Sequence, residues 1–204
     1  MRKEDNKNLI DFYYLFYTRA ASRLVPAAAC GSRGGVAAMP HLTKAALFLI
    51  ILTMIAIASD HGGLALKAEI KKLLEEKALP YKDFGTNSAE SCDYALFGYP
   101  AAMAVASGEC ERGILICGTG VGMSLVANKI RGIRCVVCSD CFTAALSREH
   151  NDSNILALGE RVVGLGLGRF IASTWLETSF SGGRHARRIA HITQIEEGKA
   201  PGLN

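Results

Sequence analysis

The sequence predicts an α/β fold: a doubly wound, Rossmann-like, five-stranded parallel sheet with helices on both faces, in a single domain with an N-terminal extension. Two observations predict it. From Met54 onward, short apolar runs alternate with segments in which apolar residues recur at helical spacing. The chain of 204 residues is also 50% hydrophobic and 21% charged, which suits one good core and at most two small domains. Strands joined by helical crossovers imply a parallel sheet.

The first unit is a strand, a polar loop and an amphipathic helix. The strand at 55–58 ends at Ser-Asp-His-Gly-Gly, residues 59–63. Apolar residues then recur at helical spacing among Lys and Glu until Pro80 ends the helix. A short second strand is expected at 81–84, followed by a loop.

The remaining elements follow the same alternation. The apolar run 113–117 has the size of a buried parallel strand. The other expected strands are 133–138 and 154–158. The expected helices are 94–107, rich in small residues, and then 121–129, 141–148, 164–177 and 183–196.

The chain is expected to divide into three parts. Residues 54–197 form the functional domain, 198–204 a C-terminal tail, and 1–53 an extension outside the catalytic fold. The apolar run at 45–58 is about 14 residues long, whereas a membrane span needs roughly 20. A membrane-anchored protein is therefore the minority alternative. The net positive charge lies in the extension, which has few acidic residues, and the remainder is close to neutral, so no nucleic-acid partner is expected.

The seven cysteines are odd in number and lie mostly in apolar surroundings. This pattern indicates reduced thiols and a cytoplasmic protein. The spacing Cys135-x-x-Cys138-x-x-Cys141 occurs in metal sites, but residues three apart on a strand point to opposite faces. No second Cys or His cluster completes a ligand set, so no metal is expected.

A glycine-rich turn follows the strand at 113–117, with Cys117 at the junction. Gly118, Gly120 and Gly122 let the backbone turn tightly and direct successive N–H groups at one point. The sequence therefore predicts an anion hole with a thiol beside it. These N–H groups and the N-terminus of the following helix would stabilise a thiolate at Cys117.

Polar residues follow the strands at their carboxyl ends, where open parallel sheets bind ligands. Asp60 and His61 follow the first strand, and Cys117 and Thr119 the third. His150, in contrast, precedes the fifth strand in a polar loop, so within one subunit it should lie far from Cys117. We therefore expect a site shared between two subunits.

Four motifs together resemble a known family. They are Ser-Asp-His-Gly-Gly at 59–63, Gly-Ile-Leu-Ile-Cys-Gly-Thr-Gly-Val-Gly at 113–122, Ser-Arg-Glu-His-Asn-Asp at 147–152 and Gly-Gly-Arg-His-Ala-Arg-Arg at 182–188. In this order they resemble type B ribose-5-phosphate isomerase, in the sugar-phosphate isomerase family that includes galactose-6-phosphate isomerase subunits. The resemblance covers residues 54 to about 197 and none of 1–53.

The resemblance implies an aldose–ketose isomerase of the pentose phosphate pathway, which interconverts D-ribose 5-phosphate and D-ribulose 5-phosphate through an enediolate without metal or cofactor. Cys117 would be the base, Thr119 would assist it, and His150 would open the furanose ring. Residues implied to bind the substrate are Asp60, His61, Gly118, Thr119, Gly120, Val121, Gly122, Asn151, Arg161, Arg184 and Arg188. The implied assembly is a homodimer with shared active sites, or a tetramer.

Each assignment has a competitor. Asp60 could cap the helix after it, and Arg184 and Arg188 could form a solvated basic face. A nucleotide-binding module would use the same sheet, but no acidic residue ends the second strand in the dinucleotide pattern. Within enzymes, the alternative substrate is a six-carbon 6-phosphate sugar, allose 6-phosphate or galactose 6-phosphate.

Overall fold

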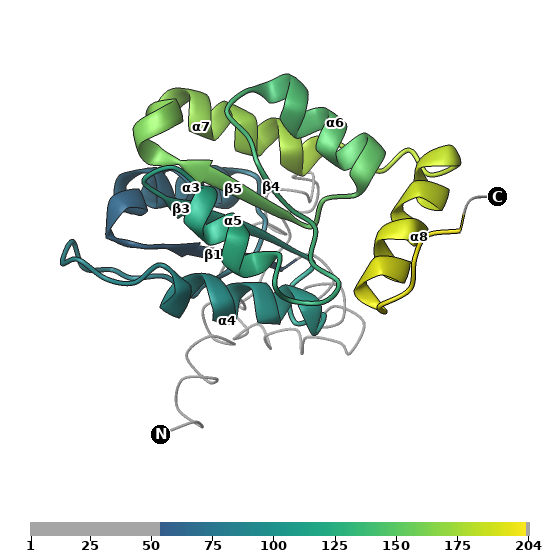
Figure 1. Ribbon diagram of the computed structural model, residues 1–204. Helices are drawn as coiled ribbons and strands as arrows, with labels where there is room; N and C mark the ends of the chain where they lie inside the picture. Colours follow the sequence, from purple (N-terminus) through teal and green to yellow (C-terminus); the bar gives the residue numbers. More distant parts are fainter. Residues whose placement is uncertain (1–53, 203–204) are drawn as a thin grey trace, which may run out of the picture. The chain divides into compact units, whose positions relative to one another are not determined.

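A computed structural model describes residues 54–202, which lie in the second of the chain's two units, Ile51–Asn204. The expected extension at 1–53 lies outside the described residues and stays a prediction. The described part contains a five-stranded, all-parallel sheet in the order β2-β1-β3-β5-β4 (Figure 1). Its strands are β1 Ile55–Ser59, β2 Tyr81–Asp83, β3 Arg112–Cys117, β4 Cys135–Val137 and β5 Ile155–Gly159. The predicted doubly wound parallel sheet is confirmed.

Helices cover both faces of the sheet (Figure 1). They are α3 Leu64–Glu76, α4 Ala95–Ala106, α5 Val121–Ala127, α6 Cys141–Asn151, α7 Glu160–Glu177 and α8 Arg184–Glu196, with a short 3₁₀ turn η1 at His61–Gly63. Helices α3, α6 and α7 pack together on one face, and α4 and α5 on the other. Helix α8 packs against α6.

The two faces of the sheet differ in side-chain size because strand residues alternate between faces. Ile55 and Ile57 of β1 join the main core cluster around the fully buried Trp175 of α7. The Trp175 Nε1–H donates to Ser153 Oγ at 2.8 Å. Between the isoleucines, Ala56 of β1 is also fully buried but outside that cluster. Its small side chain suits the close approach of the alanine-rich helix α4.

Helix α6 is longer than predicted, and this corrects the position of His150. The helix runs to Asn151, so His150 lies in its last turn and not in a loop. Asp152 ends the helix at φ 44°, a left-handed conformation that is uncommon outside glycine. Its carboxylate is held there by Arg148 Nη1 at 2.8 Å and Arg134 Nη2 at 3.0 Å. These long-range contacts are not visible in local periodicity.

Three further boundaries differ. Helix α5 ends at Ala127, β4 is only three residues long, and α7 begins at Glu160 with a break at Gly164, where φ is 64°. The sequence pattern placed the start of this helix at the break itself. Residues 198–202 of the expected tail carry no helix or strand.

The six cysteines among residues 54–202 are free thiols, as expected; Cys30 lies outside this range. Cys138 belongs to the core cluster, and burial raises its pKa to about 11. Burial also raises the pKa of Cys135. Within the described range, no three His, Cys, Asp or Glu side chains gather where they could hold a metal ion.

None of the helices in residues 54–202 is long and apolar enough to span a bilayer. Most of the apolar run at 45–58 lies outside this range, so the membrane-anchored alternative and the cytoplasmic location both stay predictions.

Candidate active site

A pocket of about 270 Å³ opens at the carboxyl ends of β1 and β3. Strand β2 pairs with one edge of β1 and β3 pairs with the other edge. The strand order therefore reverses between β1 and β3, and this pair forms the switch point of the sheet. The pocket is lined by Asp60, His61, Gly62, Tyr94, Cys117, Gly118, Thr119, Gly122 and Arg161. Seven of the predicted site residues are therefore brought together: Asp60, His61, Cys117, Gly118, Thr119, Gly122 and Arg161.

Cys117 ends β3 and faces the glycine turn. Its side chain is 5% exposed, and the Gly120 N–H donates to its Sγ at 3.1 Å. Gly120 has φ 79°, and a Cβ there would lie 3.0 Å from the Leu158 carbonyl carbon. The glycine is thus required both by conformation and by space. Its N–H would stabilise negative charge on the sulfur.

Asp60 serves two purposes at the end of β1. Its Oδ1 accepts a hydrogen bond from the Gly62 N–H at 2.8 Å and so caps the 3₁₀ turn. Asp60 is therefore a cap, but of the short 3₁₀ turn and not of α3, whose N-cap is Gly63 without a side-chain hydrogen bond. The same carboxyl group lines the pocket and is 7% exposed. Capping fixes its orientation there.

His61 also lines the pocket, and its ring is oriented by the loop after β2. The Cys92 N–H donates to His61 Nδ1 at 3.2 Å. Since Nδ1 accepts, the neutral ring carries its proton on Nε2. Nε2–H is then left as the hydrogen-bond donor of this side chain.

Arg161 supplies a cation beside the glycine turn. It is the second residue of α7, and its backbone N–H donates to the Gly118 carbonyl at 3.1 Å. A Cβ added at Gly118 would lie 3.5 Å from Arg161 Nε, so the guanidinium lies over the turn. The preceding Glu160 accepts from the Leu66 N–H at 2.8 Å, which fixes the start of α7 against α3.

Tyr94 was missed by sequence reasoning. Its ring lies over Gly122, where an added Cβ would be 3.0 Å from Tyr94 Cζ. The loop that carries it is anchored by Lys67, only 3% exposed, whose Nζ donates to Asp83 Oδ1 at 3.0 Å and to the Thr86 carbonyl at 2.8 Å. In the sequence, Lys67 sits among the charged residues of an amphipathic pattern, and Tyr94 is one of three aromatic residues within 94–99, so neither stands out as a site residue.

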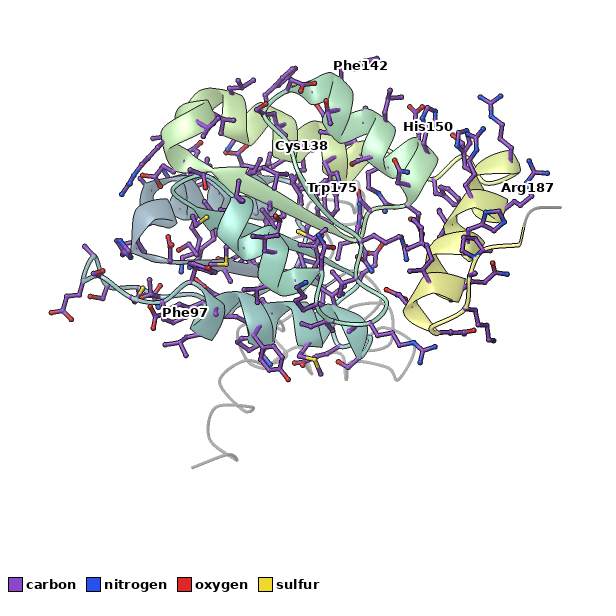
Figure 2. The ribbon with its side chains drawn as sticks, viewed as in Figure 1. Phe97, Cys138, Phe142, His150, Trp175 and Arg187 are labelled. Carbon is purple, nitrogen blue, oxygen red and sulfur yellow. The ribbon has the colours of Figure 1, made fainter. Side chains whose placement is uncertain are left out.

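The other predicted residues gather elsewhere, at α6 and α8. His150 stacks on His185 with ring centroids 4.1 Å apart and planes 3° apart. Figure 2 shows His150 at the end of α6 beside the start of α8. The remaining members of this second group are Asn151, Arg184 and Arg188. Val121 belongs to neither group: it is the first residue of α5 and is half exposed.

The two groups belong to opposite ends of the sheet. Cys117 is paired with Gly159 at the carboxyl end of β5, whereas Gly113 is paired with Ile155 at its amino end. Four residues of strand separate these levels, about 13 Å at ~3.3 Å per residue. His150 precedes the amino end of β5, so one chain does not bring it to Cys117.

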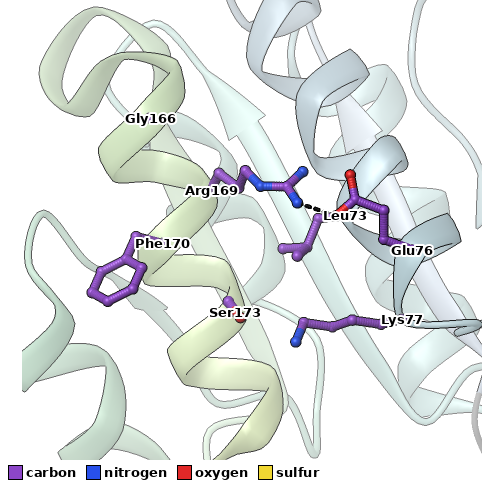
Figure 3. A pocket seen from close by; sticks show the side chains of 7 residues that line it. All are labelled: Leu73, Glu76, Lys77, Gly166, Arg169, Phe170 and Ser173. Atoms are coloured by element: carbon purple, nitrogen blue, oxygen red, sulfur yellow. Dashed lines mark hydrogen bonds and ion pairs between the residues drawn. The ribbon is translucent and has the colours of Figure 1, made fainter.

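A larger cavity of about 410 Å³ lies between α3 and α7 (Figure 3). Its charged side chains are already paired: Arg169 with Glu69 and Glu76, and Lys77 with Glu177. None of its lining residues belongs to the four sequence motifs, and none is a cysteine or a histidine. The pocket at β1 and β3 is therefore the candidate active site.

The chain is also similar to several known proteins. A family model described as Ribose/Galactose Isomerase matches residues 55–192. The Bacillus subtilis protein YwlF, named as a candidate sugar phosphate isomerase, is 55% identical over 144 residues, 70% of this chain and 97% of that protein. Ribose-5-phosphate isomerase B of Escherichia coli is 52% identical over 143 residues, 70% of this chain and 96% of its own length.

A solved structure has the same fold. That of ribose-5-phosphate isomerase B from Clostridium thermocellum superposes with a TM-score of 0.70 at 56% identity and covers 71% of this chain and 98% of that one.

Proposed function

The chain belongs to the ribose/galactose isomerase family, and we propose that it interconverts D-ribose 5-phosphate and D-ribulose 5-phosphate. Membership of the family makes it a sugar-phosphate isomerase of the aldose–ketose class. One observation carries the cysteine mechanism. The Cys117 Sγ accepts the Gly120 N–H within a pocket that also holds Asp60 and Arg161.

In the proposed reaction the Cys117 thiolate removes the proton from C2 of the open-chain aldose. The electron pair of that C–H bond forms the C1–C2 double bond, and the carbonyl pair moves to O1 to give an enediolate. The Cys117 thiol returns the proton to C1 while the O2 proton moves to O1, which leaves a ketone at C2. Atoms and electrons balance without a cofactor.

Other residues of the pocket would stabilise the enediolate and bind the sugar phosphate. Backbone N–H groups from Gly118 to Gly122 would stabilise the enediolate oxygen, and loss of one such donor typically costs about 100- to 1000-fold in rate. Asp60, oriented by its cap, would hold a sugar hydroxyl, while Thr119 would assist Cys117 and Arg161 would contribute charge at the phosphate.

The second group of residues would come from a second copy of the chain. His150 of the partner subunit would open the furanose ring, with Asn151 beside it. Arg184 and Arg188 are four apart on α8, so they share a face. Their guanidinium groups suit bidentate binding of a phosphate. Support comes from the two groups lying at opposite ends of one sheet.

A six-carbon 6-phosphate remains the alternative substrate. The Bacillus subtilis relative is named without its sugar. In the proposed dimer, the distance between the arginines of α8 and Cys117 would set the length of sugar that fits.

The test compares the full chain with Cys117→Ala and with Cys141→Ala, a thiol outside the pocket. Initial rates are measured on ribose 5-phosphate, allose 6-phosphate and galactose 6-phosphate. We expect strong turnover of ribose 5-phosphate, its loss in Cys117→Ala and near-full activity in Cys141→Ala. Preference for a hexose phosphate would overturn the substrate. A Cys117→Ala enzyme with most of its rate would overturn the mechanism.

A further inference from the structure

His185 is the one histidine in residues 54–202 that is almost fully buried, at 7% exposed. It is the second residue of α8, and its ring lies flat on the His150 ring, with centroids 4.1 Å apart and planes 3° apart. The stack joins two elements that are separated by more than thirty residues of chain. Neither the sheet nor the glycine turn requires it.

The backbone fixes the start of α8 on the last turn of α6. Gly182 and Gly183 have φ of 62° and 55°, left-handed conformations that let the chain turn sharply before the helix. The Ser181 N–H donates to the Glu149 carbonyl at 3.0 Å, one residue before His150. The His185 N–H in turn donates to the Gly182 carbonyl at 3.0 Å. The position of the His185 ring is therefore determined by several contacts.

The surroundings of His185 favour a neutral ring. Arg184 Nε donates to His185 Nε2 at 3.4 Å, so Nε2 holds a lone pair and Nδ1 holds the proton. Burial lowers the pKa of His185, and His150, Arg184 and Arg188 lower it further, against the opposing charge of Glu149. Nδ1 is buried and has no hydrogen-bond partner within the described residues. Both ring nitrogens are thus unsuited to exchanging protons with a substrate.

We infer that His185 is a positioning residue: its ring, stacked face to face on His150, holds the His150 imidazole in the orientation needed to open the sugar ring. This inference rests on the proposed function, because it takes His150 as the group that acts on the furanose. His185 contributes through the flatness and placement of its ring and not through a proton.

The substitution His185→Phe separates the effect of the flat ring from the effect of its two nitrogen atoms. His185→Phe keeps a flat ring for stacking and removes both nitrogens, including the buried unpartnered Nδ1–H, so the fold should tolerate it. His185→Ala removes the ring. His191→Ala, at another histidine of α8, is the matched control. A misplacement of about 1 Å can cost on the order of 100-fold in rate, so His185→Ala should lower kcat on ribose 5-phosphate by roughly 10- to 100-fold. KM should stay within about twofold, and His185→Phe and His191→Ala should keep at least about half of kcat.

Proton NMR of His150 gives a readout independent of activity. A ring stacked above His150 shifts its Hε1 resonance, and we expect this ring-current shift in the wild type and in His185→Phe but not in His185→Ala. Two results for His185→Ala would overturn the inference: an unchanged His150 Hε1 shift, or a full kcat. A third would be an equal loss of kcat in the Phe and Ala variants while His185→Phe keeps the shift. A wild type that shows the shift but does not turn over ribose 5-phosphate instead overturns the proposed function, and the role of the pair with it.

Discussion

Replacing Gly159 with alanine tests whether the glycine turn must sit as close to β5 as the structure places it. Gly159 has an extended backbone, φ −104° and ψ 110°, so alanine is not excluded by conformation. The obstacle is space: an added Cβ would lie 2.6 Å from the Thr119 carbonyl carbon and 2.7 Å from its Cα and oxygen. Since ordinary contact begins at 3.4 Å, the turn would have to move by about 0.8 Å, the difference between 3.4 and 2.6 Å.

A shift of that size falls on the backbone that flanks Cys117. Because about 1 Å of misplacement can cost on the order of 100-fold, we expect Gly159→Ala to lower kcat/KM by roughly 10- to 100-fold. Overpacking of this kind also costs about 1–3 kcal/mol of stability. Initial rates on ribose 5-phosphate and calorimetric Tm measure the two effects.

Gly166→Ala, in the helix α7 that follows Gly159, is the matched control. A Cβ there meets nothing within 4 Å, so the activity should be unchanged, and the stability should rise by about 0.5–1 kcal/mol. Wild-type rates and an unchanged Tm in Gly159→Ala would refute the reasoning, because the turn would then not depend on this close approach.

Three other predictions concern residues that support the proposed site. Lys67→Met removes a buried cation from Asp83, which keeps its ion pair with Lys71, and from the carbonyls of the loop that carries Tyr94. Leaving these buried acceptors unpaired should cost about 1–3 kcal/mol in urea unfolding. The exposed Lys72→Met should cost little, and equal effects of the two variants would contradict the assignment. Arg161→Ala should raise KM for the sugar phosphate with a smaller change in kcat, and an unchanged KM would place the phosphate elsewhere. The pKa of His185 is lowered on folding, so protons bind the unfolded chain more readily and Tm should fall as pH drops from 7.5 to 5.5. The Tm of His185→Phe should fall less over that pH range. Parallel curves of Tm against pH for the wild type and His185→Phe would show that His185 is not responsible.

The functional side chains at the ends of β1 and β3 could be predicted because each lies next to its strand in the sequence. Asp60 directly follows β1 and Cys117 is the last residue of β3, and parallel strands bring their carboxyl ends to one edge of the sheet. The strand order could not be read in the same way, because placing β5 between β3 and β4 depends on which edges pair and not on local pattern.

Residues whose roles depend on distant partners were missed or misplaced. Lys67 has a surface residue's pattern but is buried, because Asp83 and the loop carbonyls satisfy its charge. Tyr94 reaches Gly122 only through that anchored loop. His150 was expected in a loop, but the pairing of Arg148 and Arg134 with Asp152 extends α6 past it.

In the proposed dimer, one active site takes Cys117 from one chain and His150 from the other. Heterodimers of a Cys117→Ala chain and a His150→Ala chain, purified with two different tags, show whether the site is shared in this way. One site of such a dimer would lack both residues and the other would have both. We expect inactive homodimers of each variant and a heterodimer with about half the wild-type turnover of ribose 5-phosphate, because one of its two sites is intact. Heterodimers as inactive as both parents would contradict the shared site.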